Sequence, residues 1–543
     1  MRTFEDQIHP TFKEACHARA LLEDDDEWLR CLQDASLMQT GQQLRNLFVM
    51  ILLHCSPVDP HHLWAATKGH LCDDLQYQLT HRLHMQDPTE DQIYDYGLYL
   101  INVGLRKSGK SLQDFAEMPL PQIHWENRVG NQLIAEQHNY DLNALHQIVE
   151  NGERTLTDEQ RAVYDAMLEK VENNQAGGSF LHSAGGCGKT YVCNLLAAAV
   201  RAREKIVLCV ASSGIASLLL SGGRTAHSRF KIPIPINEAS TCNIKKDDPW
   251  HELLLHTSLI IWDEVPMQHQ HVIECVDRSL RDLHGVDADF GGIPVLFVGD
   301  FRQTLPVVPH GSREHIVGAT FCRSQLWGNI RVFKLETNMR LGRDPICDQF
   351  AEWLLQIGAG IGMSAENEVT LPEYMRCGND MRSLIDALYG ELLDPTRDHA
   401  LPNDYFLDRT ILSAKNVEVN EINSTVLASF TGETTIYTSV DSVTEKEYDY
   451  IPTEFLHTLD PSGFPLHQLE LKNGAPLMLL RNLDPSHGLY NGTRMILMSS
   501  TRRVLQCRVL RKENEGVEGG DNDIVLIPRM ALDAPQDEFP VPL

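Results

Sequence analysis

A glycine-rich loop, HSAGGCGKTYV, has the residue types and spacing that can hold phosphate groups. It lies between a short apolar run, GSFLHS, and a run of good helix formers, TYVCNLLAAAVRA. In a strand–loop–helix setting, backbone N–H groups and the helix N-terminus face the anion. The lysine of the loop would reach the β and γ phosphates of ATP, and the threonine hydroxyl would ligate Mg²⁺. The residues that we expect to bind the nucleotide are Gly185, Gly186, Gly188, Lys189 and Thr190.

Two acids end a second apolar run, SLIIWDE. At the carboxyl end of a strand, Asp263 can hold the Mg²⁺ shell, and Glu264 is placed to polarise the attacking water. Two acids at a helix N-cap are the alternative interpretation. That alternative is disfavoured because the pair follows the glycine-rich loop in the same strand pattern.

Two further motifs follow buried runs. VLFVGDFRQ places Gln303 after a strand, where it can touch the γ phosphate and couple hydrolysis to movement. FKLETNMR places Arg340 after the next strand, where it can stabilise the charge that develops on the γ phosphate. A surface glutamine and a surface salt bridge are the competing interpretations of these two residues.

These residues need a sheet to position them. From about residue 155, short apolar runs without alternation (KIVLCVA, SLIIWDE, IPVLFVGD) are separated by segments long enough for crossover helices. The pattern predicts a doubly wound α/β fold with a parallel sheet. Residues 1 to about 120 have apolar residues at helical spacing instead. Their most apolar run, LFVMILL, is too short to cross a membrane, so we expect a buried core helix.

The bulk composition limits the partners. The net charge is −28, but residues 151–350 hold 21 basic and 23 acidic residues, so a local basic groove for DNA is compatible with the sequence. No CxxC pair occurs among the 13 cysteines, which argues against a zinc site of the usual spacing. We expect the histidine pairs His61–His62 and His269/His271 to be surface or helix-cap residues.

In this order, the motifs resemble those of the Pif-one/RecD branch of superfamily-one DNA helicases. LTDEQRAVYDAM is similar to the motif of that family that contacts the base, with Gln160 at the adenine position. VASSGIASLLLSGGRTAHSRFKIP is similar to the motif that grips single-stranded DNA. Thr225 and His227 occupy DNA-contacting positions of that motif, and Phe230 would be available for base stacking.

The resemblance implies a RecA-like P-loop NTPase fold and an ATP-dependent 5′-to-3′ DNA helicase that uses ATP and Mg²⁺. The expected partners are single-stranded DNA or DNA duplex junctions, with roles in recombination, repair, telomere maintenance or transposition, in the nucleus and not at a membrane.

Segments such as LRNLFVMILLHC and LKNGAPLMLLRNLDPSHGLYNGTRMIL look like the helicase portion of Helitron, rolling-circle transposon proteins. This resemblance implies a helical Helitron-type region over residues 1–140, a RecA-like ATPase domain over 150–343 and a partial, strand-rich second RecA-like domain over 344–543. It also implies a rolling-circle nuclease domain as a partner.

The sequence departs from the family at Ser183, where a glycine begins the loop, and at Cys187, where threonine is usual. The family's last motifs do not follow DEFPVPL, so we expect weak ATP hydrolysis and little unwinding from this chain. A non-unwinding, ATP-binding relic and an unrelated P-loop switch or chaperone ATPase are the alternatives.

Overall fold

The computed structural model of the chain describes residues 3–4, 7–8, 25–36, 39–81, 83, 85, 87–125, 130–246, 248–340, 345–364, 368–393, 405–413, 415–430, 432–441, 452–459, 464–484, 488–510, 524–530 and 532. The chain divides into two compact units. The first, here the central unit, comprises residues 126–371 and 485–488. The second, the split unit, comprises residues 1–125, 372–484 and 489–543. The boundaries predicted at 140, 150 and 343 stay predictions.

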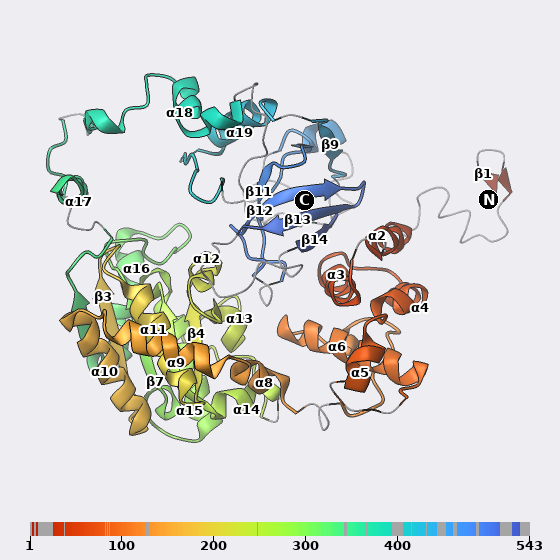
Figure 1. The fold of residues 1–543 in the computed structure, drawn as a ribbon, viewed down its shortest axis with the longest axis horizontal. Coiled ribbons are helices and arrows are strands. Elements are labelled where there is room, and N and C mark those ends of the chain that lie inside the picture. The colour runs from red at the N-terminus through yellow and green to blue at the C-terminus, as the bar shows by residue number, and fades with distance from the viewer. Residues whose placement is uncertain are drawn as a thin grey trace. The chain divides into compact units, whose positions relative to one another are not determined.

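The central unit, which has the orange-to-green colours in Figure 1, is built on a six-stranded parallel sheet. The strand order is β5-β4-β6-β7-β3-β8. Because the strands run parallel, each connection between consecutive strands crosses over a face of the sheet. This topology confirms the predicted α/β fold with a parallel sheet. The strands are β3 (Gly177–Ser183), β4 (Ile206–Ala211), β5 (Arg224–Thr225), β6 (Thr257–Asp263), β7 (Pro294–Gly299) and β8 (Arg331–Leu335).

Helices cover both faces of this sheet, so the inner strands are apolar on both sides. In β6, Ile260 and Trp262 pack into one core, while Leu259 and Ile261 pack into the other. The period of two along each strand sends alternate side chains to opposite faces. The helices of the unit are α8 (Gln132–His138), α9 (Leu142–Glu153), α10 (Asp158–Glu172), α11 (Lys189–Ala202), α12 (Gly214–Leu218), α13 (Ala226–Phe230), α14 (Pro249–Leu255), α15 (Gln270–His284), α16 (Arg313–Gly318) and α17 (Pro345–Gly358), with 3₁₀ turns at η2 (Val265–Met267), η3 (Asp289–Gly292), η4 (Phe321–Arg323) and η5 (Gln325–Asn329).

The helices and turns on the two faces of the sheet form two separate hydrophobic cores, one on each face. The first core takes residues from α8, α13, α14, α15 and the turns η3, η4 and η5. The second takes residues from α10, α11 and α12. The phosphate-loop helix α11 is therefore held by the second core, with Val192, Leu196 and Val200 fully buried.

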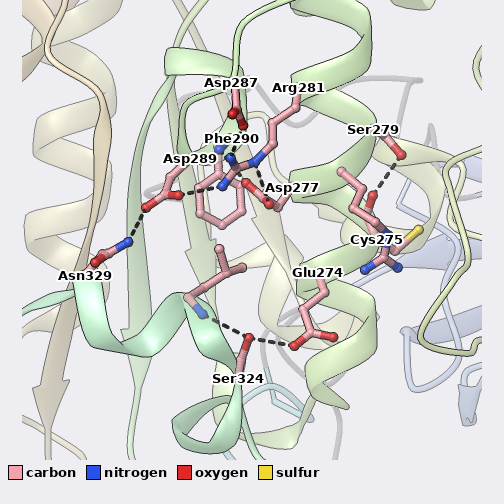
Figure 2. Close-up of polar contacts among 12 residues, drawn as sticks. Glu274, Cys275, Asp277, Ser279, Arg281, Asp287, Asp289, Phe290, Ser324 and Asn329 are labelled. Atoms are coloured by element: carbon pink, nitrogen blue, oxygen red, sulfur yellow. Dashed lines mark hydrogen bonds and ion pairs between the residues drawn. The ribbon is translucent and has the colours of Figure 1, made fainter.

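A charged cluster fixes the end of α15 to the turn that leads into β7, as Figure 2 shows. The Arg281 guanidinium contacts three carboxylates, those of Asp277 at 2.9 Å, Asp287 at 2.8 Å and Asp289 at 2.6 Å. Asp277 also accepts a hydrogen bond of 2.6 Å from the backbone N–H of Phe290. Phe290 has φ of +56°, and the Asp277 carboxylate holds the turn in this conformation. The turn places the Phe290 ring in the hydrophobic core on one face of the sheet.

The N-terminal part of the split unit is helical, as predicted. Its elements are α2 (Asp26–Ser36), α3 (Gly41–His54), α4 (Pro60–Leu71), α5 (Leu75–His81), α6 (Glu90–Lys107) and η1 (Leu112–Asp114), preceded by the short strands β1 (Thr3–Phe4) and β2 (Gln7–Ile8). The apolar run LFVMILL lies in α3, where Leu47, Phe48 and Ile51 are fully buried, which confirms a core helix. In the part of the chain that the structure describes, no helix is long and apolar enough to span a bilayer.

The C-terminal part of the split unit is strand-rich, as predicted, but its described strands pair antiparallel. A four-stranded sheet has the order β11-β12-β13-β14, and β9 pairs with β10 in a separate ribbon. The elements are α18 (Met381–Leu393), α19 (Asn416–Ala428), α20 (Thr453–Leu456), β9 (Thr435–Thr438), β10 (Gln468–Leu471), β11 (Pro476–Met478), β12 (Arg494–Ser500), β13 (Val504–Val509) and β14 (Ile524–Pro528), with the 3₁₀ turn η6 (Glu373–Met375). A RecA-like lobe is built on a parallel sheet, so assigning residues 344–543 to a second such lobe stays a prediction.

Candidate functional site

The glycine-rich loop joins β3 to α11 at the carboxyl edge of the sheet. Gly186 and Gly188 have φ of +88° and +85°, a region that side chains rarely adopt. A Cβ on Gly186 would lie 2.7 Å from the Asn338 Oδ1, and one on Gly188 would lie 2.5 Å from the Gln160 Nε2. The side chains of Asn338 and Gln160 therefore pack closely against the loop at these two glycines. Gly185 has open space instead, with no atom within 4 Å of its Cβ position.

Ser183, the departure at the start of the loop, is accommodated without backbone strain. It is the last residue of β3, where its backbone pairs with Leu335 of β8, and it is absent from the residues with positive φ. Its side chain is 1% exposed, and its hydroxyl donates to the Ala184 carbonyl at 2.8 Å. A glycine is not required at this position, because a strand conformation suits any residue.

Lys189 begins α11 and points back over the loop. Its ammonium donates to the carbonyls of Ser183 at 2.8 Å and Ala184 at 3.0 Å. Thr190 is the next residue of the helix and is half-buried. The ammonium, the loop N–H groups and the helix N-terminus make this a cradle suited to an anion such as a nucleotide phosphate.

Gln160 joins the loop to α10 and is 3% exposed. Its Oε1 accepts from the Thr157 N–H at 3.1 Å, which completes a capping box at the start of α10. Its Nε2 donates to the Cys187 carbonyl at 3.1 Å. Both ends of the amide are therefore engaged within the protein, and the adenine contact stays a prediction.

Asp263 and Glu264 lie at the carboxyl end of β6. Burial raises the pKa of Asp263 to about 6, against the lowering effects of the Glu264 N–H, which donates to its Oδ1 at 2.8 Å, and of the Lys189 charge. Glu264 is half-buried and has φ of +53°, a conformation that costs a non-glycine residue about 1–3 kcal/mol. Strain of this kind is concentrated at functional sites. The strand register brings both acids to the same sheet edge as the loop.

Gln303 follows β7 and is exposed. Its backbone N–H donates to the Asp300 carbonyl at 3.0 Å, which forms the turn after the strand. Asp300 is 5% exposed, and burial works against its ionisation, but hydrogen bonds from the Arg302 side chain and backbone hold its pKa below the ordinary value. The carboxylate thus fixes the turn that carries Gln303.

Arg340 lies next to the loop. The backbone N–H groups of Met339 and Arg340 donate to the Gly186 carbonyl at 2.8 Å and 3.1 Å. The segment is also held from α10, because the Glu159 carboxylate accepts from the Glu336 N–H at 2.9 Å. The backbone of this exposed arginine therefore lies beside the phosphate loop, as predicted. The sequence did not indicate the backbone hydrogen bonds that hold it there.

The predicted DNA-contacting residues lie at α13. Thr225 caps this short helix, with its hydroxyl 2.9 Å from the Ser228 hydroxyl. His227 is half-buried, and burial lowers its pKa, which favours a neutral imidazole.

The expectation that Phe230 stacks on bases is wrong for this conformation. Its ring is 1% exposed and packs against Trp262 at 5.8 Å in the first core. The apolar side of α13 faces the sheet, so the phenyl ring stabilises the fold.

Comparison with known proteins agrees with this geometry. Residues 155–368 match the model of the PIF1-like helicase family, and residues 454–499 match the model of the 2B domain of the DNA helicase Pif1. The first match contains every residue predicted for the site. The second match assigns part of the strand-rich region to a 2B domain, where the sequence indicated only a partial RecA-like domain.

The chain is also similar to curated proteins. The chain is 30% identical over 329 residues to the ATP-dependent DNA helicase Pif1 of Psychrobacter sp., which covers 59% of this chain and 44% of that protein. It is 25% identical over 345 residues to the ATP-dependent DNA helicase PIF1 of Homo sapiens, covering 63% of this chain and 46% of that protein. The chain thus spans about half the length of these relatives.

Solved structures resemble the chain more weakly. A Pif1 helicase described for DNA unwinding at forked double-stranded DNA has a TM-score of 0.46 and 24% identity, over 69% of this chain and 76% of that chain. The Bacteroides Pif1 helicase in complex with ADP-AlF₃ and single-stranded DNA has a TM-score of 0.44 and 24% identity, over 69% and 74%.

Proposed function

We propose that this chain is an ATP-dependent DNA helicase motor that moves 5′ to 3′ on single-stranded DNA or at duplex junctions. The observation that carries the proposal is the meeting of the phosphate loop, the acid pair and the Arg340 segment at one sheet edge of a PIF1-like region. Unrelated P-loop switches share the loop, but the family match over residues 155–368 distinguishes this chain from them.

The residues of the site divide the chemistry among them. The loop N–H groups and Lys189 would hold the phosphates, and Lys189 would leave the carbonyls of Ser183 and Ala184 to do so. Thr190 and Asp263 would hold Mg²⁺, which supplies charge neutralisation at the phosphates. An ionised Asp263 is needed for that role, and the positive charge of the metal would favour ionisation despite burial.

Hydrolysis needs an oriented water and stabilisation of the departing charge. Glu264 follows the metal ligand directly and is placed to accept a proton from water. Arg340 is exposed beside the loop, and its guanidinium would stabilise charge on the γ phosphate. Gln303, on the turn after β7, would contact that phosphate and couple its hydrolysis to movement of the neighbouring segments.

The DNA side of the proposal rests on α13. Thr225 and His227 offer a hydroxyl and an imidazole at the carboxyl end of β5, which suits phosphate contacts. By family resemblance we also propose a nuclear location and, from the Helitron-like segments, a rolling-circle nuclease as partner. Localisation of a fluorescently tagged chain and co-purification with such a nuclease test these two proposals.

The experiment that tests the function measures ATP hydrolysis with and without single-stranded DNA, and unwinding of a duplex with a 5′ tail. We expect weak but DNA-stimulated hydrolysis in the parent chain and its loss in Lys189→Ala. Lys246→Ala is the matched control, because Lys246 is exposed and forms a surface ion pair with Asp282 at 3.6 Å. Equal turnover in Lys189→Ala would refute the site. Hydrolysis without unwinding would refute the helicase activity of this chain and favour the ATP-binding relic.

A further inference from the structure

Two histidines and an aspartate meet in the split unit, far from the phosphate loop in sequence. Asp441 follows β9, His457 follows α20, and His467 precedes β10. The pairing of β9 with β10 brings two of these segments together, because Thr438 lies opposite Gln468 and the Ser439 N–H donates to the His467 carbonyl at 2.9 Å. Within the described part of the chain, this is the one group of three potential metal ligands whose ligand atoms all lie within 4.8 Å of one another.

The distances are close to those of a metal site. The Asp441 Oδ2 lies 3.5 Å from the His467 Nδ1 and 3.7 Å from the His457 Nε2. Tetrahedral coordination with bonds of about 2.0–2.2 Å places neighbouring ligand atoms roughly 3.4 Å apart. The Asp441 oxygen needs shifts of only a few tenths of an ångström to reach that spacing from the two nitrogens. The two rings lie 15° from parallel, so one imidazole would also turn out of the stack to bring both in-plane nitrogen lone pairs onto one ion. The three side chains are 21–34% exposed, which leaves a route for an ion and space for water as a further ligand.

The cluster is also hydrogen-bonded. The imidazole rings of His457 and His467 are stacked with centroids 3.6 Å apart. The Ser439 hydroxyl donates to Asp441 at 2.8 Å and lies 2.7 Å from the His467 Nδ1. Ser439 therefore holds the carboxylate and one imidazole in place, as outer-shell partners of metal ligands do.

We propose that Asp441, His457 and His467 bind one divalent transition-metal ion of the zinc class. Two imidazole nitrogens and one carboxylate oxygen suit Zn²⁺ and its first-row neighbours, whereas Mg²⁺ and Ca²⁺ prefer oxygen ligands alone. The site is separate from the proposed nucleotide site, and the proposal does not depend on helicase activity. A bound ion would join β9, α20 and β10 and so stabilise this part of the split unit.

The sequence analysis did not find this cluster. The three ligands are sixteen and ten residues apart, and none of them belongs to a short paired motif. Short ligand spacings are the signal by which zinc sites are found in a sequence. Here the strand pairing brings the ligands together instead.

The test is a titration of the full chain, without a histidine tag and with Mg²⁺ and ATP present, with ZnCl₂ in isothermal calorimetry and with CoCl₂ by visible absorption. We expect one ion per chain, an increase in melting temperature on Zn²⁺ addition, and binding at least about 100-fold weaker in His457→Ala/His467→Ala, since even the loss of an outer-shell partner costs roughly 10–100-fold. His70→Ala is the matched control, because this histidine is exposed on α4, and it should bind as the parent chain does.

Two controls keep the result specific. Circular dichroism of each variant without metal checks folding, and Asp441→Asn supplies a second variant that keeps both rings. Metal affinity and stoichiometry that are the same in the parent chain and in both ligand variants would overturn the proposal. The same holds if the parent chain binds Zn²⁺ no more tightly than His457→Ala/His467→Ala.

Discussion

Substituting Gly186 by alanine tests the geometry of the phosphate loop directly. Gly186 has φ of +88°, and a Cβ there would lie 2.7 Å from the Asn338 Oδ1 and 3.1 Å from the Arg340 Cβ. The left-handed conformation alone costs an alanine about 1–2 kcal/mol. If the alanine raises the free energy of the binding conformation of the loop by that amount, nucleotide affinity falls by roughly 5–30-fold, since each 1.4 kcal/mol is a factor of ten. The contacts to Asn338 and Arg340 add to the loss.

The assay is binding of a fluorescent ATP analogue, with thermal unfolding measured alongside. Gly328→Ala is the matched control, because it adds the same methyl group outside the loop, where φ is not positive and no atom lies within 4 Å. We expect this control to bind as the parent chain does. The double variant Gly186→Ala/Asn338→Ala should recover part of the loss, because it removes the 2.7 Å contact but not the unfavourable φ. Equal affinity of Gly328→Ala and Gly186→Ala would refute this account of the loop.

Three further predictions follow from the structure. Ser183→Gly should leave nucleotide affinity unchanged and lower stability by about 0.5–1 kcal/mol in urea unfolding, because glycine weakens a strand; an increase in affinity would show that the serine impairs the loop. Asp263 has a pKa of about 6 against an ordinary value of 3.8, so its contribution to stability is full below about pH 3.8 and is lost as the pH rises through 6. Asp263→Asn should therefore be more stable than the parent chain by up to about 3 kcal/mol above pH 7. A difference in urea midpoint between the variant and the parent chain that is the same at pH 4 and at pH 8 would contradict this. Arg281→Met should lower stability by about 2–4 kcal/mol because Asp277 stays buried without its cation, while Arg30→Met, which breaks an exposed pair, should cost less than about 1 kcal/mol; similar losses in the two variants would refute the role of the cluster.

The parallel sheet and the nucleotide-site residues could be predicted because their signals are local. Runs such as IPVLFVGD are apolar without alternation, and this is the pattern of a strand buried on both faces. The capping box of α6 also stands in the sequence, as Thr89 followed three residues later by Gln92. Each of these features depends on fewer than about ten consecutive residues, a length at which propensity and periodicity are informative.

Features that depend on distant pairing could not be predicted in this way. Whether Phe230 faces DNA or the sheet depends on which side of α13 meets Trp262 of β6, and the five residues of α13 are too few to show a periodicity. The antiparallel pairing of β11–β14 and the ligand cluster at Asp441 likewise follow from strand neighbours far apart in the chain.

The phosphate loop is held by two segments that are distant from it in sequence. A nucleotide bound at the loop would therefore be coupled to both segments. Gln160 of α10 bonds to the Cys187 carbonyl, and the N–H groups of Met339 and Arg340 bond to the Gly186 carbonyl. A phosphate that draws the loop N–H groups toward itself reorients the same peptide units whose carbonyls make these contacts, because each peptide plane is rigid. A nucleotide bound at the loop would therefore be coupled to the segment after β8 through backbone hydrogen bonds, which do not depend on the side chains at Ser183 and Cys187.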